Sequence, residues 1–295
     1  MEWAAAPPDR RTAGLPAIDR TPKLYIGGKQ VRPDATYTIP IPDASGALAA
    51  EVPRGNRKDI RNAVEAAHKA ESAWARATAH TRAQVLYYFA ENLAVREREF
   101  AERLAALTAS PASADEVHLA IERAFYYAAW ADKYDGRVHH TPFRNVTLAM
   151  NEPIGVMGLA APEEAPLLGF LSLVLPAVAM GNPVVAVPSE RWPLLATDLY
   201  QVFDTSDVPG GVINIVTGIA KELVPVLAAH DDVDGVWFFG PRELGAEVEK
   251  LSAGNMKRTW VEWEARDWLD GHDGQGEEFL REATQVKNIW VPYGA

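Results

Sequence analysis

The chain of 295 residues contains no cysteine. This absence excludes disulfide bonds, a thiolate nucleophile and thiolate metal ligands within the chain, and it fits a reducing compartment. A membrane-spanning apolar run is also missing, because the longest, residues 166–180, is too short and is broken by Gly169 and Pro176. No apolar stretch follows the charged N-terminal residues as it would in a secretory signal, so we expect a cytoplasmic protein.

Positive charge is in short supply. The chain has 29 Lys and Arg against 40 Asp and Glu, a net charge of −11. Nucleic acids and anionic membranes bind basic faces, so neither is expected as a partner. Apolar residues make up 48% of the chain, which is enough for a full core. The length suits one large domain or two modest ones.

The N-terminal part is predicted to contain short strands followed by helices. Residues 1–22 are rich in Ala, Pro and Arg, which is typical of a linker or tail. Asn56 is expected to cap the first helix, and Ser113 with Glu116 three residues later predicts a capping box for the last. A strand and tight turn are expected at 24–29, and further strands at 37–42 and 48–52. The expected helices are 58–74, one from Thr81, 100–108, and 113 to about 134.

After residue 135 the pattern changes to strands. Residues 136–152 predict a hairpin that turns through Pro142. Five short apolar runs then alternate with helix-length segments, which is typical of a parallel sheet with crossover helices. The predicted fold class is therefore α/β, with a Rossmann-like doubly wound sheet, N-terminal helices and a small antiparallel sheet. The five runs are 155–161, 183–187, 212–216, 236–239 and 260–263.

Several segments resemble aldehyde dehydrogenases in the same order along the chain. The matching segments are 125–133, 151–158, 175–185, 208–218, 231–234 and 284–291. Active members carry a catalytic domain of roughly two hundred residues before the last strand, whereas this chain has only a short polar segment there. In this respect it most resembles the C-terminal pseudo-domain of the sixteenth aldehyde dehydrogenase family.

The resemblance implies a domain plan. Residues 136–152 and 279–295 would supply an oligomerisation hairpin and strand, and 269–278 would be a linker in place of the catalytic domain. The plan is completed by a linker or tail at 1–22, N-terminal strands and helices of a cofactor-type domain at 23–135, and the Rossmann-like cofactor-type domain at 153–268.

The departures from the family pattern fall on its catalytic positions. The family nucleophile is a cysteine, and none is present. The family Asn that donates to the oxyanion is replaced by Glu164, and a carboxylate accepts hydrogen bonds but repels an oxyanion. Glu262 matches the general base, but we interpret it as vestigial because it has no nucleophile to serve. Glu264 and Ala265 replace two glycines that follow the base.

The cofactor positions are also altered. The family Lys that contacts the adenosine ribose is Val187 here, and Pro241 replaces a residue that can donate to phosphate. The candidate cofactor-binding residues that remain are Pro162, Glu190, Gly218 and Gly240. Each unpaired carboxylate near the pyrophosphate would cost about 1–4 kcal/mol at ~4 Å, and micromolar affinity amounts to only about 8 kcal/mol. We therefore expect no bound cofactor, with NAD(P) binding weak if it occurs.

Two other features have functional and structural interpretations. His139 and His140 match no standard metal-ligand spacing with His230 or His272, so no metal is expected. The segment 270–278 has the composition of a metal loop without regular ligand spacing.

Four tryptophans near the last parallel strands are expected to cover the surface that a catalytic domain would occupy, or to meet a partner. They are Trp237, Trp260, Trp263 and Trp268.

The favoured function is a catalytically inactive module that assembles with itself or with an active aldehyde dehydrogenase domain. An alternative is a residual NAD(P) or small-molecule binding protein that uses the cofactor cleft. A weaker alternative is aldehyde oxidoreductase activity only as part of a larger enzyme. Another is acid–base catalysis by Glu164, Glu262 and Glu264, since grouped carboxylates spread their pKa values.

Overall fold

A mixed sheet forms the centre of the body. The computed structural model describes residues 22–293, so the predicted tail at 1–22 lies, apart from its last residue, outside the described residues. The sheet order is β11-β10-β7-β8-β9-β1-β2. The predicted parallel strands are confirmed as β7 (Met157–Ala160), β8 (Val184–Val187), β9 (Ile213–Ile215), β10 (Gly235–Phe239) and β11 (Arg258–Glu262). The strands β1 (Leu24–Ile26) and β2 (Lys29–Val31) extend this sheet in antiparallel pairing.

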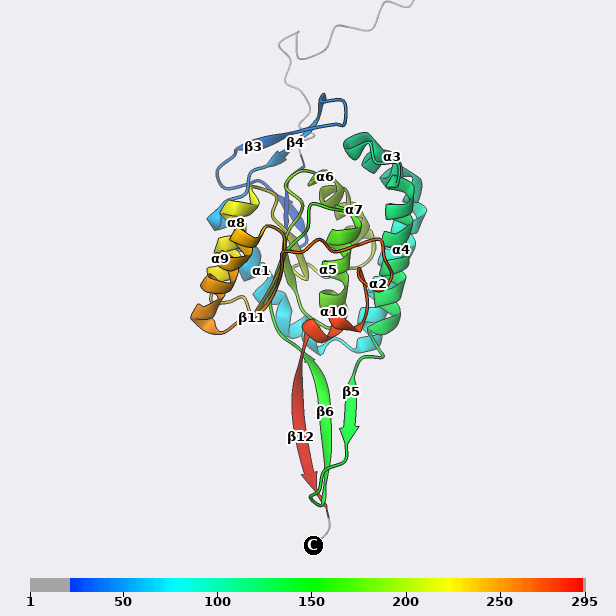
Figure 1. Ribbon diagram of the computed structural model, residues 1–295, viewed down its shortest axis with the longest axis vertical. Helices are drawn as coiled ribbons and strands as arrows, with labels where there is room; N and C mark the ends of the chain where they lie inside the picture. The colour runs from blue at the N-terminus through cyan, green and yellow to red at the C-terminus, as the bar shows by residue number, and fades with distance from the viewer. Residues whose placement is uncertain (1–21, 294–295) are drawn as a thin grey trace, which may run out of the picture.

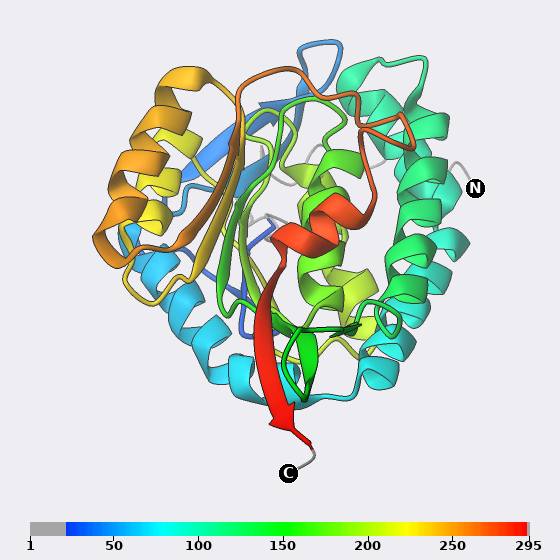
Figure 2. The same cartoon turned by 60° about the horizontal axis from the view of Figure 1, so that its bottom comes forward.

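Helices cover both faces of the sheet, as Figures 1 and 2 show. One face carries α1 (Arg57–Arg76), α8 (Ala220–Ala229) and α9 (Arg242–Ser252). The other carries α5 (Leu168–Ala179), with α2, α4, α6 and α7 packed around it. The remaining helices are α2 (Ala79–Val95), α3 (Glu97–Thr108), α4 (Ser113–Trp130), α6 (Leu194–Asp198) and α7 (Tyr200–Thr205). This arrangement is the doubly wound architecture that alternating strands and helices predict.

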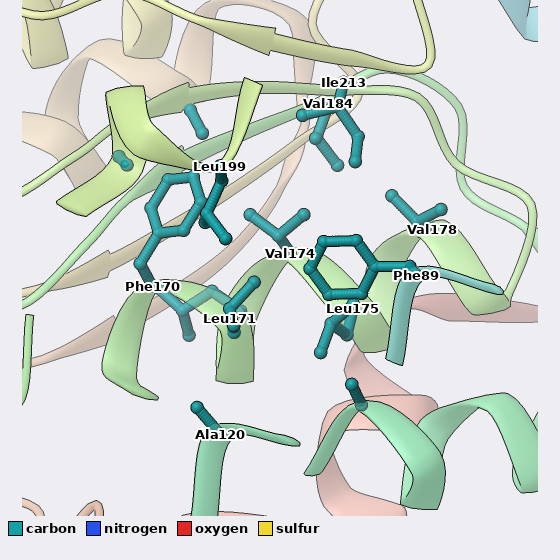
Figure 3. Packing of buried hydrophobic residues seen from close by; sticks show 14 of the residues in the cluster. Phe89, Ala120, Phe170, Leu171, Val174, Leu175, Val178, Val184, Leu199 and Ile213 are labelled. Carbon is teal, nitrogen blue, oxygen red and sulfur yellow. The ribbon is translucent and has the colours of Figure 1, made fainter. Parts of the chain in front are cut away.

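The largest core lies around α5. Every residue of this helix is buried, because sheet strands lie on one side and α2 and α4 on the other. Phe170 and Val174 point into a cluster with Phe89 of α2 and Leu199 before α7 (Figure 3). The apolar run that contains α5 is therefore a core helix. Within residues 22–293, no helix has the length and apolar character needed to cross a membrane.

The helix starts test the capping predictions. Asn56 forms a full capping box with Asp59, as its side chain predicts. The second helix begins at Ala79 rather than Thr81, because the Thr78 hydroxyl accepts from the amide of Thr81. The predicted box of Ser113 with Glu116 is wrong: Ala112 is the cap residue and makes no side-chain cap bond.

Glu116 instead caps a different helix. Its carboxylate accepts hydrogen bonds from the amides of Leu167 and Leu168, at the start of α5. These partners lie more than fifty residues along the chain, so a local pattern could not reveal them. Burial raises the pKa of the Glu116 carboxyl, while the two amide bonds oppose that shift.

A second sheet, here named the tail sheet, projects from the body (Figure 1). It contains β5 (Gly136–His139), β6 (Asn145–Pro153) and β12 (Thr284–Pro292), in the order β12-β6-β5. This confirms the predicted hairpin and small antiparallel sheet. A separate hairpin, β3 (Thr38–Pro42) with β4 (Leu48–Pro53), lies at the other end of the molecule.

The connection from β11 to β12 covers residues 263–283. It contains the short helix α10 (Glu277–Glu282), which composition did not predict. Trp268 is 2% exposed and Phe279 is fully buried, so part of this connection belongs to the core. Within the segment 269–278, the carbonyls of Asp273 and Gly274 accept hydrogen bonds from Arg266 and Arg123 of the body.

Candidate functional site

A cleft opens at the carboxyl ends of β7, β8, β10 and β11. Its volume is about 730 Å³, and it is lined by residues from the loops that follow these strands and from the starts of α8 and α9. Ligands of doubly wound proteins bind at this edge of the sheet. The cleft is therefore the candidate site that the fold defines.

The structure brings most of the sequence-predicted residues together in this cleft. Pro162, Glu190 and Gly240 line it, as do the carboxylates of Glu163, Glu164 and Glu264. Gly218 does not line it: an added Cβ there would meet Leu223 and the backbone of Gly55. The role of Gly218 that the structure supports is close packing of the chain before α8.

Two of these carboxylates already have backbone partners. Glu163 accepts hydrogen bonds from the Ser189 hydroxyl at 2.6 Å, the Glu190 amide at 2.8 Å and the Arg191 amide at 3.2 Å. Glu190 accepts from the amide of Ala220, the first residue of α8, at 2.9 Å. Amides at the start of a helix are the usual donors to bound anions. Here Glu190 takes one such amide at the start of α8.

The remaining lining is poorly suited to a dinucleotide. Pro241 is the cap residue of α9 and has no N–H to donate, and the apolar Val187 ends β8. Four lining carboxylates have no hydrogen-bond or ion-pair partner among residues 22–293: Glu164, Glu243, Glu247 and Glu264. The cations in the lining are Lys221 and Arg266. The lining therefore presents more unpaired carboxylates than cations to the place where a pyrophosphate would lie.

Glu262, the candidate general base, is held in an ion pair. Arg266 donates to both of its oxygens, from Nη2 at 2.6 Å and from Nε at 3.0 Å. The Trp260 indole N–H donates to the same carboxylate at 2.8 Å. Both oxygens of this carboxylate are therefore occupied by partners within the protein, and Glu262 is not among the residues that line the cleft.

Aromatic rings surround Arg266. Its guanidinium lies 5.3 Å from the ring centroids of Trp260 and Phe279, and its side chain is only 9% exposed. Phe239 and Trp268 complete this group, which we name the Arg266 cage. Arg266 also donates to the carbonyl of Asp273 at 2.7 Å, so the cage fastens the connection to the end of β11.

This arrangement corrects the prediction for the tryptophans. Trp237 and Trp268 are buried at 1% and 2% exposure, so they pack in the core and cannot meet a partner. Trp260 lies partly buried within the cage. Trp263 is 46% exposed and lines the cleft. Sequence position alone could not separate these cases, because the covering residue Phe279 follows almost twenty residues later.

Arg123 is a second buried cation that the sequence did not single out. It is 2% exposed and donates from Nη1 to the Ser172 hydroxyl and the Gly274 carbonyl, both at 2.6 Å. Burial lowers the pKa of its guanidinium. Its Nε has no partner among the described residues. Arg123 thus anchors the connection to α4 and α5, and no local sequence signal indicates this role.

The histidines considered for metal binding lie apart from the cleft. His139 ends β5 in the tail sheet and is exposed. His230 directly follows α8, in the body of the protein. The part of the chain that the structure describes contains no group of three or more His, Asp or Glu side chains placed to hold a metal ion.

Fold and cleft together define a class of protein: a Rossmann-like domain of dehydrogenase type with an attached antiparallel tail sheet. The sequence profile of the aldehyde dehydrogenase family matches residues 33–269. The chain therefore belongs to the aldehyde dehydrogenase family.

Relatives and solved structures agree with this assignment. Hydroxyisobutyraldehyde dehydrogenase of Mycolicibacterium austroafricanum is 33% identical over 259 residues, which is 85% of this chain and 51% of that protein. Mitochondrial benzaldehyde dehydrogenase of Antirrhinum majus is 35% identical over 247 residues, 81% of this chain and 46% of that protein. This chain therefore spans about half the length of the relatives it matches.

Among solved structures, betaine aldehyde dehydrogenase from Staphylococcus aureus in complex with NAD⁺ has a TM-score of 0.78 at 27% identity. The match covers 82% of this chain and 49% of that one. An NAD-dependent aldehyde dehydrogenase from Sinorhizobium meliloti has a TM-score of 0.79 at 26% identity, covering 84% of this chain and 51% of that one. These matches confirm the α/β fold.

Proposed function

We propose that this chain is a catalytically inactive aldehyde-dehydrogenase-like module that assembles with itself or with an active aldehyde dehydrogenase domain. In organisation it resembles the C-terminal pseudo-domain of the sixteenth family, and we expect it to work in the cytoplasm. The observation that carries the proposal is the short connection from β11 to β12. It joins the cofactor-type sheet to the tail sheet within residues 263–283.

The catalytic positions support inactivity. Glu164 lines the cleft where the resemblance places an oxyanion donor, and its charge would destabilise a developing oxyanion. Glu262 is paired with Arg266. No cysteine is available to form a covalent intermediate. A carboxylate cluster of Glu164, Glu262 and Glu264 is disfavoured as acid–base machinery, because Glu262 is held in the Arg266 cage.

The proposal predicts no dehydrogenase activity. The purified chain, incubated with NAD or NADP and a panel of aldehydes, should give no reduced nicotinamide above a protein-free blank. A full-length aldehyde dehydrogenase serves as the positive control. Turnover that survives repurification and falls in a Glu262→Ala variant would contradict the proposal, since a contaminant would not respond to that substitution.

Weak NAD(P) binding is the second candidate function. It is favoured by the cleft at the carboxyl ends of the strands and by a relative solved with NAD⁺. We expect affinity weaker than millimolar, because the helix-start amide of Ala220 is taken by Glu190. A ligand at one hundred times its Kd stabilises by about 2.7 kcal/mol. A raised melting temperature at micromolar NAD would therefore favour the binding-protein alternative.

A further inference from the structure

The tail sheet ends in an edge strand with free backbone groups. In the order β12-β6-β5, β12 pairs only with β6 among the described residues. The amide of Tyr293 donates to the carbonyl of Arg144, which lies on the β6 side. Because backbone groups alternate in direction along a strand, the N–H and C=O groups of Val286, Asn288 and Trp290 point away from β6. Pro292 falls on the same outward set, where its missing N–H costs no bond to β6.

The side chains on this edge suit pairing with themselves. Val286 is 59% exposed and Trp290 is 58% exposed. They lie two residues to either side of Asn288, on one face of the sheet. An antiparallel pair of β12 strands with a two-fold axis at Asn288 would place Val286 opposite Trp290 of the second copy, twice. Aromatic and β-branched residues form favourable cross-strand pairs.

From this we infer that β12 is a self-complementary edge, and that two copies of this chain pair through it, antiparallel and centred on Asn288. The pairing would form up to about six backbone hydrogen bonds and would join two tail sheets into one. Two-fold dimers with an isologous interface of this kind are the commonest homo-oligomers. The inference rests on the assembly part of the proposed function and names one partner.

Neighbouring registers are less favourable. An axis at Lys287 would set two ammonium groups directly opposite each other. An axis at Ile289 would set Val286 opposite Pro292, which has no N–H to donate. With the axis at Asn288, Lys287 lies opposite Ile289 of the second copy. In this register its ammonium group has no cation directly opposite, and it pairs with Glu152 at 3.0 Å within the same chain.

The absence of cysteine allows a direct test of this register. In an Asn288→Cys variant, the two new thiols would lie on the axis with Cα atoms about 5.5 Å apart. A disulfide requires about 4.4–6.8 Å. Under mild oxidation this variant should form a covalent dimer of twice the 32.3 kDa chain mass. Val286→Cys and Trp290→Cys should each fail alone and should crosslink when mixed.

The controls separate specific pairing from chance contact. Tyr37→Cys introduces a thiol at a site that is 68% exposed directly before β3, whose hairpin lies at the opposite end of the molecule from the tail sheet, and it should not crosslink. Asn288→Cys crosslinking no faster than Tyr37→Cys would overturn the inference. Preferential crosslinking of Ile289→Cys would overturn the register and with it the self-complementary pairing.

Non-covalent assembly provides an independent measurement. Sedimentation should give a dimer for the intact chain, and Trp290→Lys should weaken it at least about tenfold. A Val286→Glu, Trp290→Lys double variant should recover the dimer, because opposite charges would then face each other across the axis. A monomer that still binds a full-length aldehyde dehydrogenase would sink this inference and leave the proposed function standing. Dehydrogenase activity of the chain would contradict the proposed function and leave this inference standing.

Discussion

The Arg266 cage makes a quantitative prediction about stability. Arg266→Met removes the guanidinium but keeps much of the apolar stem. Glu262, whose side chain is 28% exposed, would lose its ion-pair partner. Breaking a buried ion pair from one side costs about 3–5 kcal/mol, and the partial exposure of Glu262 places the value at the lower end. We therefore expect a loss of about 3 kcal/mol, part of which reflects lost cation–π contacts.

The assay is urea unfolding followed by tryptophan fluorescence, since Trp260 and Trp268 report on the cage directly. A loss of about 3 kcal/mol corresponds to a fall of roughly 6–12 °C in melting temperature for a domain of this size. An Arg266→Met, Glu262→Gln double variant should lose less than half as much, because no charge is left unpaired. Arg281→Met is the matched control, because the Arg281 side chain is 62% exposed in its ion pair with Glu278, and it should change stability by less than about 1 kcal/mol.

Two results would refute this reasoning. A loss below about 1 kcal/mol for Arg266→Met would mean that water reaches the cage and solvates Glu262. A double variant as unstable as the single one would mean that packing of the arginine stem, and not charge compensation, holds the connection.

Two more predictions concern helix starts. Burial raises the pKa of Glu116 above its ordinary 4.5, so this group's contribution to stability is fully present below that value and is lost as the pH rises through the raised pKa. The side chain introduced by Glu116→Gln cannot titrate. The stability of this variant relative to the wild type should therefore rise as the pH increases from about 4.5, measured as the difference in urea midpoints. A difference that stays constant with pH would contradict the sign. Asn56→Ala should cost about 1 kcal/mol in the same unfolding assay, because it removes the capping box of α1. Asn62→Ala, which removes an asparagine from inside the same helix, is the control and tests whether the loss is specific to the cap.

Periodicity and strand spacing were sufficient to predict the body of the fold. The five parallel strands are buried apolar runs, and the pattern that predicts them depends only on neighbouring residues. The cap at Asn56 was predictable for the same reason, because Asp59 lies three residues away. The box at Ser113 was not, because Glu116 finds stronger partners at the start of α5.

The candidate site was predictable as a location but not as a set of contacts. The resemblance placed Glu164, Glu190 and Glu264 at the cofactor and catalytic positions, and they line one cleft together with Glu163. It did not indicate that Glu190 binds the amide of Ala220, or that Arg266 neutralises Glu262. Both depend on distances between side chains and backbone groups that only the packed structure fixes.

A single buried side chain explains how the tail sheet is held to the body. Asn182, which is 0% exposed, accepts from the amides of Ile154 and Gly155 at the exit of β6. It also donates to the carbonyl of Ala283, just before β12. One amide group therefore fixes both strands where they leave the body, next to the start of β8. Since a fixed strand loses less conformational entropy on pairing than a mobile one, this bond network would favour the pairing through β12 that we propose.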